Sequence, residues 1–129
     1  MSNVELLRQA YQDFAEGNIE AVVAIFHPDI EWNNCQGLPH ISGDGVSIGP
    51  NAVVQENLAP IPEHFEGFHI EIQELFGCGD KVVMVGYHQG VWKATGKEFK
   101  ANAIHVSTVK EGKVTHFFEA EDTAEIINP

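Results

Sequence analysis

The chain has 129 residues, which fits one domain spanning 1–129, and 43% of them are hydrophobic, enough for a buried core. Its 19 acidic residues outnumber 7 basic ones, giving a formal net charge of −12, so nucleic acid is not an expected partner. No apolar run approaches the roughly 18 residues of a membrane span, and the first residues do not resemble a secretory signal. We therefore expect a cytoplasmic protein in which Cys35 and Cys78 are free thiols.

The first segment, residues 2–16, predicts an amphipathic helix. Ser2 and Glu5 have the spacing of a capping box, in which side chains satisfy free backbone N–H groups of the first turn. After Gly17, Asn18 suits the N-cap of a second helix, which the next proline ends. Apolar residues of the first helix repeat at steps of three and four and form one stripe, made of Leu7, Ala10, Tyr11 and Phe14.

A short strand and a loop follow the second helix. Residues 30–34 predict the strand, in which Trp32 and Asn34 point to the same side. The glycine-rich residues 35–49 predict a loop long enough to act as a lid or a mouth. Residues 50–58 predict a third helix, with proline in its first turn and further prolines at its end.

The second half of the chain predicts long strands. Polarity alternates over 68–73, whereas 82–85 is apolar on both faces and should be covered on both sides. One hairpin joins 81–92 to 97–109, and a second joins that strand to 113–120. Helices followed by antiparallel strands predict an α+β domain with its helices on one face of the sheet. Apolar residues on the other face predict a homodimer through the sheet.

The final hairpin brings two titratable residues together. Its turn, residues 110–112, suits a three-residue loop in which Gly112 adopts the left-handed region. That loop places His105 opposite Phe117, with Glu119 diagonal to His105 and on the same face, because side chains alternate along a strand. A two-residue loop would invert this parity and separate the pair.

The face that carries His105 and Glu119 is otherwise small and apolar. Beneath covering helices it would leave a cavity with a dry wall, in which burial raises the pKa of a carboxyl group. A carboxyl group beside an imidazole in such a pocket suits general acid–base catalysis, although a His or Glu in a hairpin is often only solvated or structural. Four aromatic residues suit an apolar substrate pocket and equally a plain core: Phe14, Trp32, Phe65 and Phe117.

Other classes of site find little support in the sequence. The histidine pairs of helical zinc sites are absent, so no metal is expected. Neither a nucleophile elbow nor a glycine-rich phosphate loop is present, so no cofactor is expected either. The pattern does not fix the register of the hairpin that carries His88. Four histidines fall on expected helix ends, loops or outward strand positions: His27, His40, His64 and His69.

Three segments, residues 17–23, 28–32 and 112–123, resemble the SnoaL-like polyketide cyclases. These belong to the nuclear transport factor 2-like superfamily, together with the ketosteroid isomerases. The resemblance covers nearly the whole chain. It implies a cone-shaped α+β barrel, in which three N-terminal helices pack in a curved antiparallel sheet, and a protein that is commonly a dimer.

The resemblance separates two chemistries. The position of the ketosteroid isomerase base corresponds to Asn34, whose amide cannot abstract a proton, so steroid isomerase activity is not expected. The isomerases' pocket tyrosine corresponds to Ala10, and Tyr11, one place off, is expected to point elsewhere. The polyketide cyclases match better, with their acid–base Asp at Glu119 and their pocket histidine at His105. Glu in place of Asp keeps the carboxyl group but lengthens the side chain by one methylene.

The resulting hypothesis is a SnoaL-like isomerase or cyclase that needs no cofactor. Glu119 would take the proton next to the carbonyl of a small apolar substrate, while His105 and Asn34 hold the enolate oxygen. The alternative is a module of the same fold that binds a small ligand or a partner without chemistry. Epoxide hydrolase chemistry of the limonene type needs an Asp-Arg-Asp relay, and Arg8 on the first helix is the only arginine. The substrate itself is not readable from the sequence.

Overall fold

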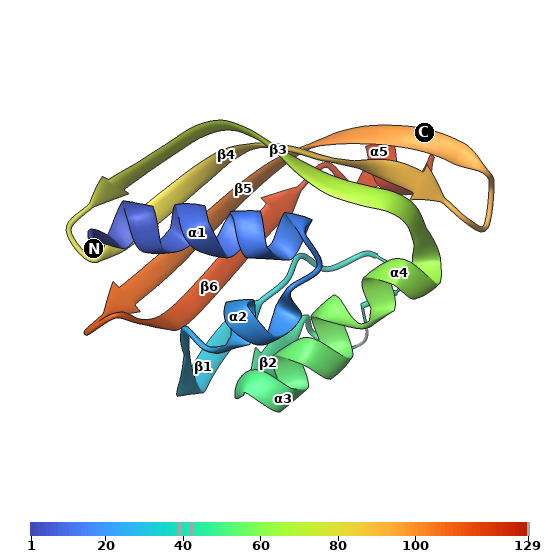
Figure 1. Ribbon diagram of the computed structural model, residues 1–129. Helices are drawn as coiled ribbons and strands as arrows, with labels where there is room; N and C mark the ends of the chain where they lie inside the picture. Colours follow the sequence, from blue (N-terminus) through green and yellow to red (C-terminus); the bar gives the residue numbers. More distant parts are fainter. Residues whose placement is uncertain (39, 42, 129) are drawn as a thin grey trace.

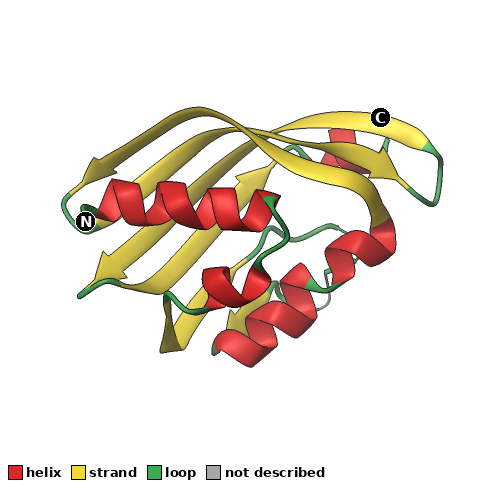
Figure 2. Cartoon of the chain, viewed as in Figure 1, coloured by secondary structure: helices red, strands yellow, loops and turns green. Residues whose placement is uncertain are grey.

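The computed structural model describes residues 1–38, 40, 41 and 43–128. A curved six-stranded sheet in the order β2-β1-β6-β5-β4-β3 carries the helices on one face, as Figures 1 and 2 show. The strands are β1 (Phe26–Asn33), β2 (Val46–Ile48), β3 (Phe65–Cys78), β4 (Lys81–Trp92), β5 (Lys97–Lys110) and β6 (Lys113–Glu121). The helices are α1 (Asn3–Ala15), α2 (Ile19–Val23), α3 (Pro50–Val53), the π-helix η1 (Val54–Leu58), α4 (Pro60–His64) and α5 (Thr123–Ile127). The predicted α+β class is confirmed.

The first two helices begin where their caps predict. The hydroxyl group of Ser2 accepts a hydrogen bond from the backbone N–H of Glu5 at 3.1 Å, and the amide oxygen of Asn18 caps α2. The second helix ends well before Pro28, because the chain turns into β1 at Phe26. Proline fits inside this strand because the pairing of β1 with β6 is interrupted over the residues around it, so its missing N–H removes no ladder bond there.

The middle of the chain has more structure than its sequence predicts. Within the expected loop 35–49, Val46–Ile48 forms the edge strand β2, which pairs with the end of β1; residues 39 and 42 of this loop lie outside the described residues. Pro60 does not end the helical segment but begins α4. Proline is favourable in that first turn, where an N–H group would have no helical partner.

The sheet is mixed. Strands β3 to β6 form the predicted antiparallel hairpins, but β1 lies parallel to β6. This pairing joins the N-terminal part of the sheet to its C-terminal strand across most of the sequence. It places β1, with Trp32, beside the strand that carries Glu119.

The turn of the final hairpin differs from the prediction. It has two residues, Glu111 and Gly112, with φ of 51° and 75°, as a tight hairpin turn requires. A two-residue turn alone would invert the parity of the strand pair. A β-bulge next to Thr108 restores it, so His105 lies directly opposite Glu119.

The predicted register of this hairpin is therefore wrong by two residues, while the shared face is correct. Phe117 pairs with Ser107 rather than with His105. The bulge leaves Thr115 as the extra residue of β6, and its hydroxyl group donates to the backbone carbonyl of Thr108 at 3.4 Å. Direct pairing brings His105 and Glu119 closer than the diagonal arrangement would.

The core lies between the sheet and the helices and has two parts. One part surrounds Ile30, Trp32 and Phe117, and the other surrounds Phe65 and the residues near α5. Within the described residues, no helix combines the length and apolar character needed to cross a membrane. The outer face of the sheet also exposes apolar side chains on several strands, among them Ile48, Phe76, Ile104 and Phe118.

Candidate functional site

A cavity of about 100 Å³ lies between the helices and the concave face of the sheet. A single water molecule needs roughly 10–15 Å³ of such space, so this cavity has room for a small organic molecule. Its wall is mostly aromatic and aliphatic, and strands β4, β5 and β6 contribute five of its polar side chains: His88, His105, Ser107, Glu119 and Glu121. All seven residues predicted for the site line it: Phe14, Trp32, Asn34, Phe65, His105, Phe117 and Glu119.

The predicted aromatic residues pack on one another around the cavity. The rings of Trp32 and Phe117 stack with centroids 3.7 Å apart. Phe65 packs in the second part of the core, 4.9 Å from the Trp92 ring. Phe14 is half-buried and meets Phe68 edge-to-face with centroids 6.3 Å apart. These residues therefore belong to both the core and the cavity wall, the two interpretations that the sequence leaves open.

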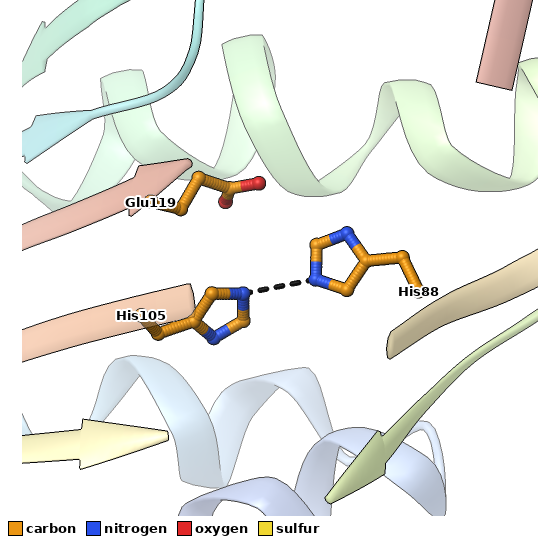
Figure 3. A group of neighbouring side chains, drawn as sticks. All are labelled: His88, His105 and Glu119. Carbon is orange, nitrogen blue, oxygen red and sulfur yellow. Dashed lines mark hydrogen bonds between the residues drawn. The ribbon is translucent and has the colours of Figure 1, made fainter. Parts of the chain in front are cut away.

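His105 holds the centre of a chain of buried hydrogen bonds. Its Nδ1 lies 2.8 Å from the hydroxyl group of Tyr11 on α1, and its Nε2 lies 2.9 Å from Nε2 of His88 on β4. Figure 3 shows the two imidazole rings and the Glu119 side chain pointing toward one another. The expectation that Tyr11 points elsewhere is wrong, because its ring also stacks on His105.

Glu121 extends this chain on the other side of His88. Nδ1 of His88 contacts a carboxylate oxygen of Glu121, and both side chains are about 95% buried. Carboxylate oxygens of Glu121 and Glu119 lie within 4.8 Å of each other, close enough for each carboxyl group to shift the pKa of the other. Five side chains from α1, β4, β5 and β6 thus form one connected polar group at the end of an apolar cavity.

Burial sets the protonation states in this group. It raises the pKa of Glu119 well above its usual value, and the neighbouring Glu121 raises it further. Burial would also raise the pKa of Glu121, but its hydrogen bonds from His88 and Glu119 outweigh that effect and lower it. The two carboxyl groups therefore share one proton, which resides on Glu119.

The same burial favours the neutral forms of His105 and Tyr11. It lowers the pKa of His105 well below the usual value, with His88 adding to the effect. It raises the pKa of the Tyr11 hydroxyl group, and the nearby Glu119 adds to that shift. Tyr11 is therefore a hydrogen-bond donor, and His105 accepts at one ring nitrogen and donates at the other.

Asn34 lies at the same end of the cavity but outside this chain. Its Nδ2 donates to the side-chain oxygen of Asn57 at 2.9 Å, and its oxygen accepts from the backbone N–H of Cys35 at 2.8 Å. Asn57, on η1, donates to the hydroxyl group of Ser47. An amide nitrogen carries two hydrogens, so one N–H of Asn34 is not used by these bonds.

Two groups of side chains have the composition of a metal site. Ligand atoms of His88, His105 and Glu119 lie within 4.8 Å of one another, as do those of Cys35, Glu119 and Glu121. The Nε2 atoms of the two histidines are at hydrogen-bond distance, 2.9 Å, whereas two ligands of tetrahedral zinc lie about 3.3 Å apart. Burial raises the pKa of Cys35 to about 12, with the two glutamates adding to it, so its thiol stays protonated. The hydrogen-bonded description fits these residues better, and the absence of a metal stays a prediction.

One histidine expected only in a loop lines the cavity. His40 contacts the Phe65 ring edge-to-face at 4.9 Å, and burial, with His64 beside it, lowers its pKa to about 4. Its Nδ1 and the indole nitrogen of Trp32 are buried without a hydrogen-bond partner among the described residues. Buried polar groups of this kind are unusual and favour a site that is completed by a ligand.

Three residues of the polar group are absent from the sequence prediction. Glu121 lies two residues after Glu119, and the strand alternation that places Glu119 inward does the same for it, but the strand was expected to end at residue 120. The side chain of His88 can be placed only when the register of its hairpin is known, and in the structure His88 pairs with Ala101. Tyr11 belongs to the apolar stripe of the first helix, which indicates that it faces inward. The alignment of the isomerases' pocket tyrosine with Ala10 predicts the opposite.

Comparison with known proteins places this architecture in a family. Residues 7–117 match the SnoaL-like domain. The chain belongs to the SnoaL-like domain family. The resemblance to the SnoaL-like proteins and the fold predicted from the sequence are thereby confirmed. Among curated proteins, none matches significantly.

Solved structures share the fold of this SnoaL-like protein over nearly its whole length. An NTF2-like protein of Burkholderia thailandensis is 26% identical, with a TM-score of 0.91 and coverage of 98% of this chain and 95% of that one. TerC, co-crystallised with polyporic acid, is also 26% identical, with a TM-score of 0.84 and coverages of 97% and 95%. An NTF2-like protein of Burkholderia xenovorans is 26% identical, with a TM-score of 0.80 and coverages of 97% and 92%.

Proposed function

We propose that this SnoaL-like protein is a cofactor-independent isomerase or cyclase that acts on a small, apolar, enolisable carbonyl compound. The observation that carries the proposal is the place of Glu119, a buried carboxyl group in the wall of an apolar cavity, where burial raises its pKa. A carboxyl group with a raised pKa is suited to exchange protons near neutral pH, as general acid–base catalysis requires. The co-crystallisation of TerC with a small organic acid shows that a relative of this fold has been studied with such a ligand.

The polar groups around Glu119 suit the oxygen of an enol or enolate. Asn34 has an N–H group that its protein hydrogen bonds do not use. Both ring nitrogens of His105 are engaged, so in our proposal His105 orients Tyr11: when a ketone or enolate is bound, His105 donates from Nδ1 to the Tyr11 oxygen, and the single hydroxyl hydrogen of Tyr11 is donated to the substrate oxygen. Such donors stabilise negative charge most strongly where water is excluded.

Exchange of carbon-bound hydrogen tests the proposal. The probe is 2-indanone, a neutral aromatic ketone, in D₂O, and the loss of its Cα–H signals is followed by proton NMR. The wild-type protein should accelerate the exchange. The Glu119→Gln variant should lose roughly 10²- to 10⁴-fold in rate, the usual contribution of one acid–base group.

The matched control is His116→Gln on the exposed face of the same strand, which should exchange at the wild-type rate. A Glu119→Gln variant as fast as the wild type would disprove the proposed role. If the wild type binds 2-indanone, detected by shifts of its amide signals, but does not accelerate exchange, the second candidate function is favoured. In that case the cavity belongs to a module that binds small ligands without chemistry.

We also propose that the protein forms a homodimer through the outer face of the sheet. That face presents exposed apolar side chains from four strands, namely Ile48 on β2, Phe118 on β6, Ile104 on β5 and Phe76 on β3. Half-buried valines of β4 lie between them. An apolar face of this extent is unusual on a monomer and typical of an interface between subunits. The predicted cytoplasmic location stays a prediction.

A further inference from the structure

We infer that Tyr11, His105, His88, Glu121 and Glu119 form one proton relay, through which the site interconverts an enol and its ketone without changing its own net charge. The inference rests on the proposed function and specifies its substrate: a neutral molecule whose oxygen reaches Tyr11 while its acidic carbon reaches Glu119. The continuous contacts carry the inference. Tyr11 lies 2.8 Å from His105, the histidines lie 2.9 Å apart, His88 contacts Glu121, and carboxylate oxygens of Glu121 and Glu119 lie within 4.8 Å of each other.

The hydrogen bonds have a consistent direction in the resting state. Oε2 of Glu121 contacts Nδ1 of His88 and has no hydrogen-bond partner of regular geometry among the described residues, so in our proposal His88 presents Nδ1–H to it and, as a neutral ring, accepts at Nε2. His105 therefore donates from Nε2, and its Nδ1 accepts the hydroxyl proton of Tyr11. Glu119 holds the remaining proton.

Conversion of an enol to a ketone moves every proton by one bond. The carbon–carbon double bond takes the proton of Glu119 and forms a C–H bond, while the enol O–H bond breaks and its electron pair becomes part of the carbonyl group. The enol proton goes to the oxygen of Tyr11, whose own proton passes to Nδ1 of His105. The Nε2 proton of His105 passes to His88, and the Nδ1 proton of His88 passes to Glu121.

The polar group carries the same charge before and after this step, because Glu119 loses one proton and Glu121 gains one. The reverse sequence starts from the product arrangement, in which Glu119 is ionised and Glu121 is protonated; it takes a proton from carbon and delivers one to oxygen. Burial explains why such a device is useful. An isolated base in an apolar cavity would leave a buried enolate or a new buried charge, which is far more costly than a neutral pair.

A network that only satisfies buried polar groups would show the same contacts, so the test must separate conduction from hydrogen bonding. In His88→Gln, the amide still donates and accepts, but it does not pass a proton from one side to the other. With 2-indanone in D₂O we expect at least a tenfold lower exchange rate for His88→Gln, and for Glu121→Gln as a second interruption. His116→Gln is the matched control. Circular dichroism and thermal unfolding establish that each variant is folded.

Solvent isotope effects give a readout that a structural role would not change. In mixtures of H₂O and D₂O, the wild-type rate should depend on the deuterium fraction along a curve, because several protons move together. The His88→Gln rate should follow a straight line. A folded His88→Gln variant with the wild-type rate and the wild-type curve would overturn the relay.

Histidine NMR tests the relay even if 2-indanone is not converted, which would count against the proposed function instead. In the ¹⁵N-labelled protein we expect His88 to carry its proton on Nδ1 and His105 on Nε2. Glu121→Gln should shift the ring nitrogen signals of His105, which Glu121 reaches only through His88. Unchanged His105 signals in that variant, or the opposite pair of tautomers, would show that the chain is not coupled.

Discussion

Glu119 and Glu121 are two residues apart on one strand, yet their surroundings drive their pKa values in opposite directions. Glu121 has His88 as a partner, whereas Glu119 has mainly apolar neighbours and the charge of Glu121 itself. Pairs of carboxyl groups whose pKa values are separated in this way are typical of acid–base sites. The residue that keeps the proton, Glu119, is the one that the resemblance to the polyketide cyclases implies as the acid–base residue.

The raised pKa of Glu119 predicts how stability depends on pH. Below about pH 4.5 both the folded and the unfolded states hold this proton, so the contribution to stability is fully present. As the pH rises, the unfolded state ionises first, and the contribution is lost until the pH passes the folded-state pKa. Urea unfolding between pH 5 and pH 9 should show a decline from this group of at most about 1.4 kcal/mol per pH unit.

Glu119→Gln should remove this decline, because an amide does not titrate in that range. The free energies of unfolding of wild type and variant should therefore converge, or cross in favour of the variant, as the pH increases. A constant difference between the two proteins from pH 5 to pH 9 would show that Glu119 ionises normally. Buried His105, whose pKa is lowered, acts in the other direction, but it is present in both proteins and cancels in the comparison.

For single residues, the sequence predicts which face of the sheet a side chain lies on wherever strand alternation alone determines it. His105 and Glu119 follow that rule, and Glu121 obeys it too but lies one residue beyond the predicted end of the strand. Tyr11 and His88 depend on the rotation of a helix against the sheet and on the length of a loop. Neither the rotation of the helix nor the length of the loop can be read from the identity of Tyr11 or His88.

Strand β4 supplies His88, and its approach to β3 depends on Gly86. A β-carbon at this position would lie 2.0 Å from the backbone oxygen of Glu71, at the irregularity in the pairing of the two strands. Backbone atoms cannot move aside as a flexible side chain does. Gly86→Ala should therefore destabilise the protein by about 1–3 kcal/mol, the usual cost of overpacking, measured by urea or thermal unfolding.

A second strand glycine provides the control. A β-carbon on Gly77 would meet the terminal methyl group of Val4 at 2.9 Å, a side chain near the start of the chain that can move. Gly77→Ala should cost clearly less than Gly86→Ala. Equal losses of stability would mean that the close approach of β3 and β4 at Gly86 does not restrict the fold.

Elements are predictable where they have their own signals. The caps Ser2 and Asn18 predict two helix starts correctly, and the alternating strands predict the hairpins. Three residues of β2 are too few for a pattern, and Pro60 begins a helix although proline more often ends one. The C-terminal α5 forms because Asp122 caps it and Ile126 is buried against the sheet, which a short polar tail does not indicate.

The whole molecule has one face that its own chain covers and one that it leaves open (Figure 1). If the open face is a dimer interface, a charge at its centre should separate the subunits. Phe118 is 53% exposed on this face, so Phe118→Asp should preserve the fold and shift the mass measured by light scattering during gel filtration from dimer to monomer. Glu16→Lys at the exposed end of α1, on the helix side of the sheet, is the control, and a wild-type protein that runs as a monomer would refute the dimer.

At the same scale, the order of helices before strands predicts the fold class, since each helix needs an apolar face to pack on and the antiparallel strands provide it. The parallel pairing of β1 with β6 does not follow from the sequence, because it joins segments that are remote along the chain. The extent of a single domain over 1–129 stays a prediction.

The bulge at Thr115 has a consequence for how the hairpin can change in length. The tight turn and the extra residue together keep His105 and Glu119 on the inside, so parity, not length, is what the site requires. With the turn and the bulge unchanged, insertion or deletion of one residue in β6 between the bulge and Phe117 would turn Phe117, Glu119 and Glu121 outward and bring Phe118 inward. Changes of two residues would leave the side chains facing the cavity. Relatives with working sites should therefore combine an odd change in strand length with a second bulge or a changed turn, as the two-residue turn and the bulge compensate each other here.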